Sequence, residues 1–190
     1  WELKFDQNAS TEMHEILINQ KAEANTEFSK YIINNYQKWF ENPGKDQPVW
    51  SHQLMLKKVF PYLKEDRPSV FVLLDNLRYD QWKIIEPVIA ELFSIEEEDF
   101  SFSILPTTTQ YSRNALFAGL MPADIEKHYP DWWLNDNEEG GKNLKEPDLF
   151  ANLVKRSLQK DLKFEYFKVT NASHGKNLVD SAHNLLQNNL

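Results

Sequence analysis

The hydrophobic pattern of the chain changes at Asp66-Arg67-Pro68, and this change divides the chain into two parts. Before it, apolar residues recur at the spacing of amphipathic helices, first over residues 28–40 and again over residues 51–63. After it, short apolar runs alternate with helical patterns. We therefore expect a helical bundle or linker over residues 1–66 and a second domain over residues 67–190.

Three apolar runs in the second part predict strands. Residues 69–74 (SVFVLL) form a continuous run of the kind found in strands that are covered on both faces. Residues 100–105 (FSFSIL) alternate, and residues 163–169 form the third run. Strands that alternate with helices predict an α/β fold, with a mostly parallel sheet flanked by helices. The helices are expected over residues 80–92, 112–118, 122–128, 147–160 and 177–187.

Polar side chains follow the first two predicted strands. Asp75 comes directly after the first, and Pro106-Thr107-Thr108-Thr109 comes directly after the second and opens a helix. Because ligand sites form at the carboxyl ends of parallel strands, we expect the carboxylate and the hydroxyls to share one crevice. A carboxylate suits a divalent cation, and a threonine hydroxyl becomes a competent nucleophile when a cation lowers its pKa.

The helix that follows the threonines adds groups that bind anions. Its first N–H groups, near Tyr111, can point at a phosphate, and Arg113 can donate two hydrogen bonds to one. The pattern therefore predicts half of a phosphoryl-transfer site. Two other interpretations remain open at this point: Asp75 can be a loop or helix cap, and the threonines can serve turn formation alone.

A receiver domain is a further interpretation of Asp75, since an apolar strand that ends in Asp is typical of its phospho-acceptor site. Receiver domains also have an acidic pair after an earlier strand and usually a proline shortly after the Asp. Residues 76–80 contain no proline, and the region before Asp75 is helical without such a pair. We therefore disfavour this interpretation.

Composition excludes several classes of site. The chain has 190 residues and no cysteine, so disulfides, thiol catalysis and Cys-ligated zinc are excluded within it. The net charge of −8 argues against an extended nucleic-acid surface and against binding to anionic membranes. The longest strongly apolar run, residues 70–74, falls far short of the about 20 residues that cross a bilayer.

Two motifs resemble the PglZ domain of the alkaline phosphatase superfamily. One is Asp75-Asn76-Leu77-Arg78-Tyr79-Asp80-Gln81-Trp82, and the other is the run LPTTTQYSRNALFAG from Leu105 to Gly119. More closely, the chain resembles the output half of PorX-type response regulators of Bacteroidetes. In those proteins a receiver domain and a helical bundle precede the PglZ domain, and the whole regulates type IX secretion. Residues 67–190 then correspond to the N-terminal part of a PglZ domain.

The resemblance implies a metal-dependent phosphodiesterase or phosphatase. It implies two zinc ions, with manganese as the alternative metal. Pro106-Thr107-Thr108-Thr109 is also similar to the Pro-Thr-x-Thr of nucleotide pyrophosphatase/phosphodiesterases, whose second threonine is the nucleophile and corresponds to Thr109. Asp75 and Thr109 are then metal ligands, and Arg113 and Asn114 lie near the phosphate. Thr108 stays open as the alternative nucleophile.

The chain departs from the family in one respect. The superfamily completes its metal sites with later Asp and His residues, including an Asp-His-Gly that this chain lacks. Ser173-His174-Gly175 has Ser in place of the Asp. We therefore expect the remaining ligands to lie beyond Leu190, and the 190 residues alone to be inactive.

The resemblance also implies partners and a location. It implies a phosphodiester or nucleotide substrate, a histidine kinase that acts through an upstream receiver domain, and a cytoplasmic protein without membrane contact. A homodimer through the helical segment is a further hypothesis. The alternative function is a non-catalytic signalling or scaffold module that binds a partner protein or a nucleotide.

Overall fold

The computed structural model describes residues 11–44, 47–64, 67–158, 162–185 and 190. The chain divides into two compact units. One unit comprises Trp1–Gln47 and Leu77–Glu96, and the other comprises Pro48–Asn76 and Glu97–Leu190. No helix in the described ranges is both long enough and apolar enough to cross a membrane.

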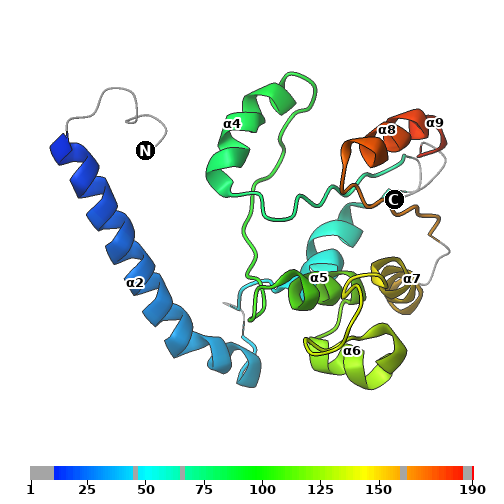
Figure 1. The fold of residues 1–190 in the computed structure, drawn as a ribbon, viewed down its shortest axis with the longest axis horizontal. Helices are drawn as coiled ribbons and strands as arrows, with labels where there is room; N and C mark the ends of the chain where they lie inside the picture. Colours follow the sequence, from blue (N-terminus) through cyan, green and yellow to red (C-terminus); the bar gives the residue numbers. More distant parts are fainter. Residues whose placement is uncertain (1–10, 45–46, 65–66, 159–161, 186–189) are drawn as a thin grey trace. The chain divides into compact units, whose positions relative to one another are not determined.

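The described residues of the first unit contain the helices α2 (Thr11–Glu41) and α4 (Tyr79–Ala90) (Figure 1). Helix α2 has 31 residues and stops just before Asn42-Pro43-Gly44, and none of its residues is buried. At the start of α4, the backbone N–H of Arg78 donates to the Gln81 side chain, which satisfies a group that the helix leaves unpaired.

The second unit is built from short helices and holds the hydrophobic core. Its first helical stretch changes type twice without a break. It begins as the α-helix α3 (Ser51–Leu54), continues as the π-helix η1 (Met55–Val59) and ends as the 3-10 helix η2 (Phe60–Tyr62). The later elements are α5 (Thr109–Ala118), α6 (Pro122–His128), η3 (Pro130–Trp132), α7 (Glu146–Ser157), α8 (Ala172–Asp180) and α9 (Ala182–Leu185).

Helix α5 lies at the centre of this unit and packs against α3, α6 and α7. Helix α7 buries one apolar face, because its apolar residues at adjacent and four-residue spacing share one side of the helix and that side packs into the core. The buried residues of this core are Met55, Leu116, Phe117, Ala118, Ile125, Trp133, Leu149, Phe150, Leu153 and Val154. The packing fixes α5 in place and, with it, the residues at its N-terminal end.

Gly119 follows the last residue of α5 and ends the helix. Its φ of +62° is left-handed, a conformation that glycine adopts without steric cost. A Cβ atom at this position would lie 2.5 Å from Cδ1 of Leu153, so the close approach of α7 also requires glycine. Helix α6 begins with Pro122, where the missing N–H costs no hydrogen bond.

The predicted parallel sheet is wrong: no strand is present in the residues that the structure describes. The run 100–105 makes one isolated parallel bridge, between Trp50 and Phe102. It consists of a hydrogen bond from Ser51 N–H to Phe102 C=O, 3.1 Å, and one from Phe102 N–H to Val49 C=O, 2.7 Å. The run 163–169 exchanges two backbone hydrogen bonds with Leu190, from Glu165 N–H and to Lys163 C=O.

The run 69–74 shows why the prediction failed. A strand needs a neighbouring backbone that satisfies its N–H and C=O groups, and apolar composition alone does not supply one. Within the described residues no ladder forms along this run. Val70 and Val72 are accordingly 77% and 67% exposed, where a central strand would bury both.

Candidate active site

Asp75 and Thr109 lie together in the second unit. Oγ1 of Thr109 donates a hydrogen bond to Oδ2 of Asp75, 3.3 Å away. Thr109 is the first residue of α5, and Asp75 lies in the turn that follows residues 69–74. The next residue in that turn, Asn76, has a left-handed φ of 61°, a conformation that asparagine tolerates better than most residues do.

Arg113 joins this pair from one turn further along α5. Its NH1 group donates to Oδ2 of Asp75 over 3.2 Å, the same oxygen that accepts from Thr109. Its NH2 group donates to Oε2 of Glu146 over 2.7 Å. The Arg113 side chain therefore spans two carboxylates, a buried one and the Asp75 carboxylate, whose side chain is 44% exposed.

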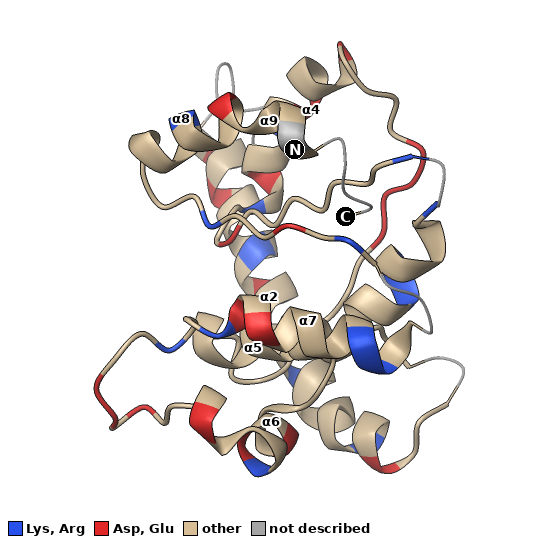
Figure 2. Cartoon of the chain, turned by 90° about the vertical axis from the view of Figure 1, so that its right-hand side faces the viewer, with Lys and Arg blue, Asp and Glu red and all other residues tan. Residues whose placement is uncertain are grey.

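Glu146 is a site residue that the sequence did not reveal. It is the first residue of α7 and is fully buried. Its Oε2 also accepts hydrogen bonds from Lys168 Nζ at 3.2 Å and from the Tyr166 hydroxyl. Burial and then the bond to Glu146 raise the pKa of Tyr166, so this hydroxyl stays protonated and remains a donor. Figure 2 shows acidic residues at the start of α7 beside α5.

Asn114 lies next to Arg113 in the sequence but turns toward a different neighbour. It is buried, and its side-chain amide donates to Lys142 C=O and accepts from the Asn143 amide, both at 3.0 Å. The Asn143 amide also donates to Thr109 C=O. Asn114 thus holds residues 142–143 against the start of α5, and a contact between Asn114 and phosphate stays a prediction.

Two more side chains of α5 hold the loop that precedes α7. The Gln110 amide donates to Leu134 C=O, and the Tyr111 hydroxyl donates to Asp136 at 3.1 Å. The bond to Asp136 raises the pKa of Tyr111. The first turns of α5 therefore carry two sets of side chains, one toward Asp75 and one toward the loop.

The N-terminal end of α5 suits an anion. Thr108 precedes the helix, and its carbonyl accepts from the N–H groups of Tyr111 and Ser112, both at 3.0 Å. Because the helix begins at Thr109, the N–H groups of Thr109 and Gln110 have no carbonyl one turn earlier in the helix. Such groups and the helix dipole favour negative charge at this end.

The donors available to a metal ion are oxygens. The Asp75 carboxylate and the Thr109 hydroxyl fit a divalent ion in kind and share a hydrogen bond. No group of three or more His, Asp or Glu side chains that could hold a metal exists within the described ranges. His174 lies on α8 with its Nδ1 3.1 Å from Oγ1 of Thr170. The described residues thus bring two oxygen donors, from Asp75 and Thr109, close together.

Two protein-family models match the chain. A family model described as the BREX system PglZ alkaline phosphatase-like domain matches residues 54–187, which include the site residues above. A second model, described as the PorX response regulator linker domain, matches residues 1–40. No curated protein matches the chain. The two matches together fit the output part of a PorX-like response regulator, and because the first covers more than half of the chain, the chain belongs to the PglZ family of alkaline phosphatase-like domains.

Proposed function

We propose that this domain is a metal-dependent phosphoesterase that cleaves phosphodiesters with Thr109 as its nucleophile. The observation that carries the proposal is the contact of the Thr109 hydroxyl and the Arg113 guanidinium with the same oxygen of Asp75. A nucleophile, a cation for phosphoryl oxygens and a carboxylate are the groups that phosphoryl transfer needs within reach of one phosphorus atom.

The first step transfers the phosphoryl group to the enzyme. Oγ1 of Thr109 forms a bond to phosphorus, and the bond between phosphorus and the leaving alcohol oxygen breaks. The leaving oxygen takes the electron pair of the broken bond together with a proton. Oδ2 of Asp75 already accepts the Thr109 hydrogen bond, so it is the first acceptor on the path of the hydroxyl proton. Arg113 and the N–H groups at the start of α5 hold the phosphoryl oxygens.

The second step restores Thr109. Water adds to phosphorus, the bond from phosphorus to Oγ1 breaks, and a phosphate monoester leaves while the hydroxyl regains its proton. Asp75 and Thr109 are the residues that would hold zinc, or manganese in its place. When bound, such an ion supplies charge stabilisation and a lower pKa for the hydroxyl. Thr108, the residue before the helix, is the alternative nucleophile.

The test is hydrolysis of bis-p-nitrophenyl phosphate by the protein with its natural termini, with zinc or manganese, beside its Thr109→Ala variant. We expect nitrophenol release by the wild type and a loss of at least about 100-fold in the variant. Thr108→Ala is the matched control, and it should retain most of the rate. Equal background release by wild type and Thr109→Ala would favour the alternative function, a non-catalytic module that binds a partner protein or a nucleotide.

We also propose that the activity is the output of a two-component response regulator that acts in type IX secretion. The support is the match of residues 1–40 to the PorX linker domain. A histidine kinase would then be the upstream partner, acting through a receiver domain in the cytoplasm. Replacing Thr109 by Ala in the genome should reduce the amount of secreted cargo in the culture medium. A homodimer through residues 1–66 stays a prediction.

A further inference from the structure

Glu146 takes no part in the steps above, yet its burial is complete and three donors converge on Oε2. Burying a carboxylate is costly, and hydrogen-bonded partners offset that cost only in part. An apolar side chain of similar size in such a place is often as stabilising as a buried ion pair or more so. Stability therefore does not account for a charge at this position, and its contacts point to a role in the site.

The contacts of Arg113 indicate what that role is. Its NH2 end is held by Glu146 at 2.7 Å, and only its NH1 end reaches the exposed carboxylate of Asp75. NH1 and the Thr109 hydroxyl therefore meet at one oxygen, because both donate to Oδ2 of Asp75. The bond from NH2 to Glu146 does not involve Asp75, so Glu146 holds the guanidinium independently of Asp75.

The charges around Glu146 favour the same role. Lys168 Nζ lies 3.2 Å from Oε2, so one cation besides Arg113 balances the buried carboxylate. Because Lys168 balances Glu146, the charge of Arg113 is balanced by Asp75, whose side chain is partly exposed. The Tyr166 hydroxyl donates a hydrogen bond to the same oxygen and limits rotation of the carboxylate.

We propose that Glu146 is a positioning residue for Arg113, which it holds so that NH1 meets a phosphoryl oxygen of the substrate beside Thr109. The inference rests on the proposed function and adds the residue that orients its phosphate contact. The ligand is a phosphate mono- or diester, and one of its oxygens takes the place of Asp75 Oδ2 on NH1. A positioning role also predicts that Glu146 acts only through Arg113.

The experiment measures inorganic phosphate binding by isothermal titration calorimetry, on the protein with its natural termini. Glu146→Gln keeps the shape of the side chain and removes its charge, and we expect phosphate affinity to fall about 10- to 100-fold. Arg113→Lys should weaken binding by a similar factor. In the double variant, Glu146→Gln should add less than about twofold to the loss from Arg113→Lys, because both changes remove one aligned contact.

The matched control is Asp148→Asn, on the same turn of α7. It removes one negative charge, but its ion pair is with Lys145 and its side chain is 50% exposed. Phosphate affinity should remain within about twofold of wild type. If circular dichroism shows that Glu146→Gln does not fold, Glu146→Asp takes its place in the test. Aspartate keeps the negative charge, but its shorter side chain moves the acceptor oxygen away from Arg113. We then expect a smaller loss of phosphate affinity than the one expected for Glu146→Gln.

Two results separate this inference from the proposed function. Wild-type phosphate affinity in folded Glu146→Gln and Glu146→Asp, or fully additive losses in the double variant, would overturn the role of Glu146 even if the protein hydrolyses diesters. If phosphate binding depends on Glu146 but the protein hydrolyses no diester, the anion site is supported and the proposed phosphoesterase activity is rejected. A wild-type protein that binds no phosphate would overturn the inference itself.

Discussion

The Thr109 hydroxyl lies 3.3 Å from Oδ2 of Asp75, although 34 residues separate them in the sequence. The first prediction follows from that contact. Asp75→Asn should reduce hydrolysis of bis-p-nitrophenyl phosphate at least about 100-fold, since it removes the charge that faces both the nucleophile and Arg113. The free energy of unfolding should change by less than about 1 kcal/mol, because the ion pair with Arg113 is partly exposed. Urea denaturation measures the free energy of unfolding, and initial rates measure the loss of hydrolysis. The control is Asp136→Asn, which changes the carboxylate that accepts the Tyr111 hydrogen bond.

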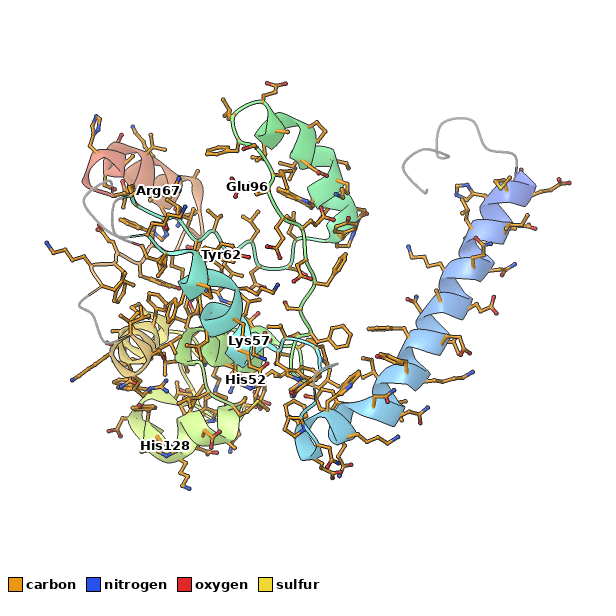
Figure 3. All side chains as sticks on the ribbon, turned by 180° about the vertical axis from the view of Figure 1, so that it is seen from behind. His52, Lys57, Tyr62, Arg67, Glu96 and His128 are labelled. Carbon is orange, nitrogen blue, oxygen red and sulfur yellow. The ribbon has the colours of Figure 1, made fainter. Side chains whose placement is uncertain are left out.

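A second prediction concerns pH. Burial, and then the nearby Lys57, lower the pKa of His52, whose Nδ1 is buried without a hydrogen-bond partner among the described residues. Figure 3 shows His52 and Lys57 along one helical stretch. A histidine whose pKa is depressed on folding contributes stability above its unfolded pKa, about 6.5, and loses it as the pH falls toward the folded pKa.

The midpoint temperature of thermal unfolding should therefore fall as the pH is lowered from about 7 to about 5. His52→Gln should flatten this slope, because Gln carries no titrating group. At pH 8, where the histidine is neutral in both states, the comparison of the two proteins gives the cost of the substitution alone. A slope that is equal in wild type and His52→Gln would show that His52 does not contribute to it.

A third prediction tests the end of α5. Gly119→Ala should destabilise the protein by about 1–3 kcal/mol, because alanine disfavours a φ of +62° and its Cβ would meet Leu153. Gly175→Ala is the matched control: it lies in α8, where a Cβ would be 3.8 Å from Val169, an ordinary contact. Alanine there should be neutral or stabilising by up to about 1 kcal/mol. Equal unfolding midpoints in urea for the two variants would contradict the prediction.

A fourth prediction uses the same substitution in two places. Val154→Thr places a hydroxyl in the core of the second unit and should cost about 1–3 kcal/mol. Val72→Thr changes a side chain that is 67% exposed and should cost less than about 0.5 kcal/mol. If residues 69–74 were instead a covered strand, Val72→Thr would cost about as much as Val154→Thr, and urea denaturation distinguishes the two cases.

Several helices of the second unit were predictable because their signals are local. The helix expected over residues 177–187 was not, because the structure has α8 (Ala172–Asp180) and α9 (Ala182–Leu185) there. The stop at Gly119, the start at Pro122 and the apolar stripe of α7 each depend on residues within a few positions of one another. The sheet was not predictable, because pairing depends on which backbone lies alongside a run. Residues 69–74 and 100–105 have the composition of strands, yet the described chain forms only the bridge from Trp50 to Phe102.

The candidate site also contains residues that the sequence predicted and one that it did not. Asp75, Thr109 and Arg113 follow from residue type and spacing, and the structure places them in contact. Glu146 gave no such signal, since a glutamate before Pro147 at a helix start is commonplace on exposed surfaces. Its hydrogen-bond donors Tyr166 and Lys168 lie about 20 residues away, and such long-range contacts leave no local mark in a sequence.

Helix α5 fixes the spacing of the two groups that meet Asp75. Thr109 and Arg113 share a face only because they lie one helical turn apart. A single residue inserted between them would rotate one away from the other by about 100°. The exposed segment between Asp136 and Gly141 carries no such restriction. In natural relatives, length variation should accumulate in that segment, and the four-residue interval should remain invariant.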